Sequence, residues 1–139
     1  MRADRITPRT KQQEYYSDFL INFDRNPISG ELARVVNERS VIRAMKNLIL
    51  TNLGERPFQS DIGSRIRHLL FEPMDDVTID LIKEAIKTTV TQHEPRVILI
   101  MSQVVPNEDN NHYDITITFA LKNAPSDLLN FSTVLKRIR

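Results

Sequence analysis

The chain has 139 residues, of which 40% are hydrophobic and 27% charged, and this size and composition are typical of one globular domain. The 19 basic and 18 acidic side chains nearly cancel, so the sequence lacks the strongly basic patch of most nucleic-acid-binding proteins. Cysteine is absent, no run of about 18 apolar residues occurs, and the N-terminus is charged. We therefore expect no disulfide, no membrane span and no secretory signal.

The N-terminal part of the chain predicts an arm followed by a short hairpin. Residues 1–17 carry several basic side chains, few apolar groups and two tyrosines, and we expect them to form a flexible arm. Residues 18–23 and 31–36 have the alternation of short strands, and the stretch between them contains the turn formers Pro and Gly. The predicted organisation is therefore the arm and a single domain, residues 18–139.

An amphipathic helix is predicted to begin after Asn37, which is a favourable N-cap residue. Glycine is common directly after a helix, so Gly54 is a natural end point. The apolar residues between these two positions recur at the spacing of one helix face, and they are Val41, Ile42, Met45, Leu48 and Ile49.

Two further helices are predicted in the middle of the chain. Residues 54–61 read as a loop, and residues 62–71 have apolar positions at roughly helical spacing. Asp75 or Asp76 is expected to cap a third helix, which should end near His93 because the residue before a proline disfavours helical backbone.

The last third of the chain changes to the period of strands. Residues 97–105 are rich in β-branched side chains, and residues 113–121 alternate strictly between apolar and polar. Turn-forming residues occupy 106–111 and 124–127. Residues 128–138 are read as a third strand, with a helix as the alternative. The predicted fold class is α+β, with short N-terminal strands and three helices packed on a C-terminal antiparallel sheet of about three strands.

The sequence contains no specific catalytic or cofactor-binding motif. Its three histidines, His68, His93 and His112, are far apart, and there is neither a phosphate-binding glycine loop nor a nucleophile elbow. We therefore predict no catalytic residues, no metal site and no cofactor.

Two short segments carry unusual polar residues. The first, Glu94-Pro95-Arg96, follows the third predicted helix, and the proline fixes the direction of both neighbours. Two interpretations stay open: an ion pair of Glu94, local or with Arg43 or Arg65, that stabilises the corner, or a rigid polar docking point for another chain.

The second segment is the loop that starts at Gly54. One interpretation places Phe58 in the core behind a helix stop, and the other has the loop present Arg56 to a partner. The candidate contact residues of this loop are Glu55, Arg56, Pro57 and Phe58.

Taken together, these segments resemble a known family. The order is an amphipathic helix, then TNLGERPFQSDIGSRIRHLLFEP (51–73), a further helix, EPR (94–96) and a strand that begins VILI. This set resembles the baseplate wedge subunits of contractile phage tails, also called the lysozyme-like family, with relatives in bacteriocins and type VI secretion. The resemblance covers residues 18–138.

The resemblance implies a non-enzymatic structural protein of the virion tail baseplate, made in the host cytoplasm and present in several copies in a ring. Its implied partners are other wedge proteins and the tail sheath protein, with the tail tube or hub as further possibilities, and neither nucleic acid nor membrane. In the family, the motif that matches Glu94, Pro95 and Arg96 is associated with docking on the helical core bundle of the wedge. The competing interpretations are a peptidoglycan-degrading enzyme and an unrelated adaptor.

The family is also associated with assembly of the first sheath ring, through strands shared between neighbours. An antiparallel sheet that ends in an edge strand offers unpaired backbone groups to such a partner strand. The candidate residues for this contact lie on the last predicted strand, and they are Leu129, Phe131, Thr133, Leu135 and Arg137.

Overall fold

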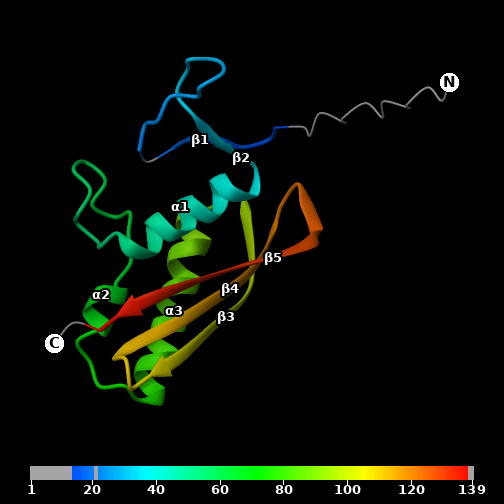
Figure 1. Ribbon diagram of the computed structural model, residues 1–139. Coiled ribbons are helices and arrows are strands. Elements are labelled where there is room, and N and C mark those ends of the chain that lie inside the picture. Colours follow the sequence, from blue (N-terminus) through cyan, green and yellow to red (C-terminus); the bar gives the residue numbers. More distant parts are fainter. Residues whose placement is uncertain (1–13, 21, 138–139) are drawn as a thin grey trace. The chain divides into compact units, whose positions relative to one another are not determined.

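A computed structural model describes residues 14–20 and 22–137 and confirms the α+β class (Figure 1). Two short strands come first, three helices follow, and three long strands end the chain. The chain divides into two compact units, Met1–Ser40 and Val41–Arg139. The division into a flexible arm and one domain from residue 18 stays a prediction.

The first unit contains an antiparallel pair, β1 (Ser17–Phe19) and β2 (Arg34–Val36). Both strands are shorter than predicted. Phe23 has a left-handed backbone with φ 52°, which a strand residue does not adopt, and a single bridge, Arg25 to Leu32, continues the ladder. The hairpin is therefore correct in place, and its predicted strand lengths are wrong.

Part of the predicted arm is held in this unit, and residues 1–13 lie outside the described residues. The side-chain oxygen of Asn37 accepts hydrogen bonds from the backbone N–H groups of Tyr15, at 2.9 Å, and Tyr16, at 3.4 Å. Asn37 itself has φ 51°, whereas an N-cap residue normally has extended backbone. Asn37 therefore ties the chain before β1 to the chain after β2.

The helix α1 (Glu38–Leu50) has the predicted buried face. It ends at Leu50 rather than Gly54, because the backbone beyond it bonds to a later segment: Ser64 donates to the carbonyl of Thr51. The same contact shortens the second helix, so α2 (Ile66–Leu69) is one turn rather than residues 62–71.

The helix α3 (Asp76–His93) has the predicted bounds. Asp75 is its N-cap and accepts a hydrogen bond from the backbone N–H of Thr78 at 2.7 Å, and this bond lowers the pKa of Asp75 from its ordinary value of 3.8. At the other end, the helix stops directly before Glu94, as expected for the residue that precedes Pro95.

The sheet consists of β3 (Val97–Asn107), β4 (His112–Leu121) and β5 (Ala124–Lys136), antiparallel in the order β3-β4-β5. The helical alternative for the last segment is wrong. The predicted turn at 124–127 is also wrong, since those residues already belong to β5 and the hairpin turns at 122–123. Residues 106 and 107 likewise extend β3.

The core of the second unit lies between α3 and one face of this sheet (Figure 1). The alternation of β4 decides which face is buried, because its odd-numbered side chains are fully inaccessible. These are Tyr113, Ile115, Ile117 and Phe119, and the helix contributes Ile82, Ile86 and Val90. The even-numbered positions of β4 face the opposite side of the sheet.

Candidate functional site

The corner, residues Glu94 to Arg96, joins the end of α3 to the start of β3. The guanidinium of Arg96 donates two hydrogen bonds to the Glu94 carboxylate, Nε to Oε1 at 2.6 Å and Nη2 to Oε2 at 2.7 Å. Two parallel bonds of this kind fix the orientation of both side chains. The local ion pair of Glu94, with Arg96, is therefore present.

The two charges of the corner differ in exposure. The Glu94 side chain is 3% exposed and that of Arg96 is 31% exposed, while Pro95 between them is exposed. Backbone bonds hold the same turn, since Val97 donates to the carbonyl of Glu94 and Lys122 donates to that of Arg96. The corner thus presents Pro95 and one side of the guanidinium to solvent, and the buried carboxylate holds the guanidinium in place.

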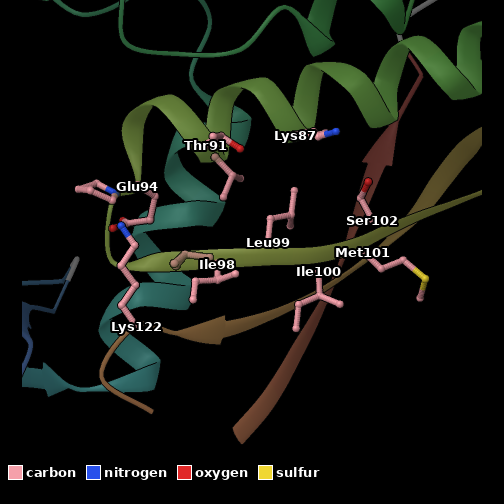
Figure 2. A pocket seen from close by; sticks show the side chains of 12 residues that line it. Lys87, Thr91, Glu94, Ile98, Leu99, Ile100, Met101, Ser102 and Lys122 are labelled. Carbon is pink, nitrogen blue, oxygen red and sulfur yellow. The ribbon is translucent and has the colours of Figure 1, made fainter. Parts of the chain in front are cut away.

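A groove runs from the corner along the open edge of β3, below α3 (Figure 2). Its volume is about 460 Å³. Lys87 and Thr91 line it from the helix, and Lys122 lies beside Glu94 at the end that meets the corner. Apolar residues of β3, from Val97 to Met101, line its other side, and the side chain of Leu99 points toward the helix (Figure 2). The groove therefore combines an apolar strand with two lysines.

A β-bulge shapes the β3 side of this groove. Leu99 pairs with Phe119 and Met101 pairs with Thr118, so Ile100 is an extra residue in β3. Because one extra residue shifts the alternation, Ile100 and Met101 are both exposed, at 52% and 54%, and both point away from the helix (Figure 2). The sequence analysis missed the bulge, because residues 97–101 are all apolar and show no alternation that an extra residue could interrupt.

The loop between α1 and α2, residues 51–64, is closed at its base. Asn52 bridges to Ser64, and the Ser64 hydroxyl donates to the carbonyl of Ile49 at 2.7 Å. Glu55 turns back into the loop, where its carboxylate accepts from both the backbone N–H and the side-chain amide of Asn52. Glu55 therefore stabilises the loop from within through its bonds to Asn52.

Phe58 lies at the tip of this loop and is fully exposed, at 106% of its reference area. The interpretation that placed Phe58 in the core is wrong. The physical reason is the short closure at the base: the backbone bonds of residues 51–64 keep the tip out in solvent. Arg56 and Pro57 beside it are exposed as well.

Four of the predicted sheath-contacting residues lie on the inward side of β5, and the fifth, Arg137, directly follows the strand. Thr133 and Leu135 are buried, and Leu129, Phe131 and Arg137 are half-buried. Phe131 makes an edge-to-face contact with Phe119, with ring centroids 6.3 Å apart. The side chains that β5 exposes are those between them, such as Leu128 and Val134. A partner strand at this edge would therefore meet the backbone of β5 and the even-numbered side chains.

Two observations concern other kinds of site. Within residues 14–20 and 22–137, no three His, Asp or Glu side chains are placed to hold a metal ion. No helix in the described part of the chain is both long and apolar enough to span a membrane.

Solved structures with this fold include a single protein and subunits of baseplates. A Geobacter sulfurreducens protein described as a candidate tail lysozyme superposes with a TM-score of 0.70 and 22% identity, over 77% of this chain and 98% of that chain. A subunit in the baseplate of the anti-feeding prophage superposes with a TM-score of 0.60 and 20% identity, over 89% of this chain and 87% of that chain. At these identities the likeness shows the fold.

The sequence defines the family. The family model described as baseplate wedge protein gp25 matches residues 35–126, so the chain belongs to that family. The chain is also 29% identical over 98 residues to the baseplate wedge protein gp25 of Enterobacteria phage T4, a match that covers 70% of this chain and 74% of the phage protein. The resemblance inferred from the sequence motifs is therefore confirmed.

Proposed function

We propose that this protein is a structural subunit of the baseplate of a contractile tail or a related injection device. In this role it docks on the helical core bundle of the wedge and templates the first ring of tail sheath. Family membership and the phage relative support the baseplate location. The observation that carries the docking role is the rigid corner, where a buried carboxylate orients a half-exposed arginine beside an exposed proline.

The roles within the corner follow from exposure. Arg96 and Pro95 make the contact, and Glu94 positions Arg96. The adjoining groove supports this assignment, because an apolar strand beside two lysines suits a helix that carries acidic side chains next to apolar ones. The exposed side of the guanidinium would then bond to a carboxylate or to helix-terminal carbonyls of the bundle.

Co-expression with the other proteins of the wedge tests the proposal. The expected result is one complex that contains this chain on size-exclusion chromatography and, in negative-stain micrographs, at the inner part of the wedge. Wedges that assemble fully without this chain, while it elutes alone, would overturn the proposal.

Testing the corner requires a variant that keeps the fold. Removing Arg96 alone leaves a buried carboxylate without its partner, which destabilises the protein itself. The double variant Glu94→Leu with Arg96→Met replaces the pair by apolar groups of similar length, an exchange that is often neutral for folding. We expect this double variant to fold normally and to be lost from the wedge complex.

Sheath templating is proposed for the open edge of β5. Within the described residues β5 pairs with β4 alone, and its register is regular from Leu128 to Lys136. The edge of β3 carries the bulge, which interrupts the row of backbone groups that a partner strand would use. The regular edge is therefore the better template for an added strand.

The two edges offer a matched pair of variants. Val134 on β5 and Val105 on β3 lie in one cross-strand row, since both pair with Asp114, and both are about half exposed. A lysine on an edge strand opposes the addition of another strand. Val134→Lys should reduce the number of baseplates that carry sheath, and Val105→Lys should leave it unchanged. Equal effects of the two lysines would contradict the choice of edge.

We propose a structural role in place of hydrolysis. Glu94 is the buried acidic side chain of the described residues, and both of its oxygens accept bonds from Arg96, so burial and the ion pair withhold this carboxylate from a sugar substrate. The purified chain should leave the turbidity of a cell-wall suspension unchanged. Clearing of the suspension that disappears in a Glu94→Gln variant would establish the enzyme instead.

A further inference from the structure

Phe58 combines two features that work against a folding role. Its side chain is fully exposed, so it gains nothing from burial, and its backbone is left-handed with φ 67°. That region is unfavourable for a bulky side chain, and asparagine or glycine adopts it more readily. The fold itself would thus be better served by another residue at this position.

The loop that carries Phe58 is nevertheless well ordered by its own contacts. Gly54 donates to the carbonyl of Ser60 at 2.8 Å, and Ile62 donates to that of Gln59 at 3.1 Å. Gly63 packs so closely that a Cβ atom there would lie 2.7 Å from the backbone of Asn52. The Glu55 carboxylate accepts two further bonds, from the backbone N–H and from the side-chain amide of Asn52. The internal contacts of the loop therefore fix the position of Phe58 while its ring stays in solvent.

The charges of the tip define what it can bind. Arg56, two residues before Phe58, is exposed and forms no ion pair with any described residue. The carboxylate of Glu55 is occupied inside the loop. The tip therefore presents one aromatic ring and one free guanidinium, and aromatic and arginine side chains are the commonest energetic anchors of protein interfaces.

We propose that the tip of loop 51–64 is a second docking point, at which Phe58 enters an apolar pocket with an acidic rim on another protein of the wedge. The pocket buries the ring, and an acidic side chain at its rim pairs with Arg56. This inference rests on the proposed function for the identity of the partner, but it uses none of the residues of the corner or of the sheet edges.

The test measures affinity for the purified wedge complex assembled without this chain, using immobilised full-length variants. Phe58→Asn removes the ring and suits the left-handed backbone. Phe71→Asn is the matched control, because Phe71 is another exposed phenylalanine of the same unit, at 56%. Arg56→Glu reverses the charge of the tip. Thermal unfolding of each variant shows whether the fold is kept.

We expect Phe58→Asn to unfold at or above the temperature of the parent protein and to bind the wedge complex at least about tenfold more weakly. Arg56→Glu should also weaken binding, and Phe71→Asn should bind like the parent. Parental affinity of Phe58→Asn, alongside lost binding of the Glu94→Leu, Arg96→Met double variant, would overturn this inference and leave the proposed function standing. If the parent protein itself does not bind, both fail.

A second copy of this chain is the competing occupant of the tip. Sedimentation velocity of the purified protein distinguishes the two, since the proposal expects the same sedimentation for the parent and for Phe58→Asn. Concentration-dependent association of the parent that Phe58→Asn abolishes would overturn the proposal in favour of self-association.

Discussion

The corner after α3 and the loop after α1 both follow a helix and both bind a carboxylate locally, but they use their arginines differently. At the corner, the buried Glu94 carboxylate accepts two hydrogen bonds from Arg96, whose side chain is 31% exposed. In the loop, the Glu55 carboxylate accepts hydrogen bonds from Asn52, and the side chains of Arg56 and Phe58 are exposed to solvent. In both places a carboxylate holds the local structure together, and the residues beside it, Arg96 at the corner and Arg56 and Phe58 in the loop, are the ones proposed to make the contact.

The largest effect on stability is expected at the corner. Arg96→Ala leaves the Glu94 carboxylate buried without its guanidinium, which should lower the free energy of unfolding by about 3 kcal/mol. This is the low end for buried pairs, because the Arg96 side chain is 31% exposed. Chemical denaturation measures the loss. If Arg96→Ala is as stable as the parent, the pair does not hold the corner.

The second-largest loss of stability is expected at the base of the loop 51–64. Gly63→Ala places a Cβ atom against the backbone of Asn52 at a residue with φ 150°, so the strand-like contact at the base must move. We expect a loss of about 1–3 kcal/mol, as is usual for strained backbone positions. Gly30→Ala is a control for the left-handed backbone alone, because no atom lies within 4 Å of its added Cβ. If both variants lose the same stability, the contact between the added Cβ atom and the Asn52 backbone is not the cause of the loss.

The smallest effect, with the opposite sign, is expected at the tip of the loop. Phe58→Asn relieves the left-handed backbone of a bulky residue, and it should raise the free energy of unfolding by up to about 1 kcal/mol. Thermal unfolding monitored by circular dichroism measures the gain. A clear loss of stability would mean that the ring packs within the fold after all.

The elements of this fold that follow from local physics could be predicted from the sequence. The helix α3 is defined by the cap at Asp75 and by Pro95, and β4 by its strict alternation. Features that depend on contacts between distant segments could not be predicted from the sequence. The early end of α1 depends on Ser64, and the start of β5 at Ala124 depends on pairing with Leu121.

The same distinction holds for the candidate site. The motif at 94–96 was visible in the sequence, but whether Glu94 pairs with Arg96 or with a distant arginine depends on the fold. The exposure of Phe58 depends on the closure of its loop by Asn52 and Ser64, which no local pattern shows. The groove along β3 depends on a bulge at Ile100 that only the register with β4 reveals.

The most direct test of docking at the corner is site-specific photo-cross-linking in assembled baseplates. One cross-linking residue replaces Lys122, whose backbone bonds to the corner, and a second replaces exposed Asp109, at the far end of the β3–β4 hairpin roughly 35 Å along the strand. The account predicts that position 122 captures the helical core-bundle protein and that position 109 does not. Capture of the bundle from position 109 alone, in baseplates that contain both variants at parental levels, would contradict it.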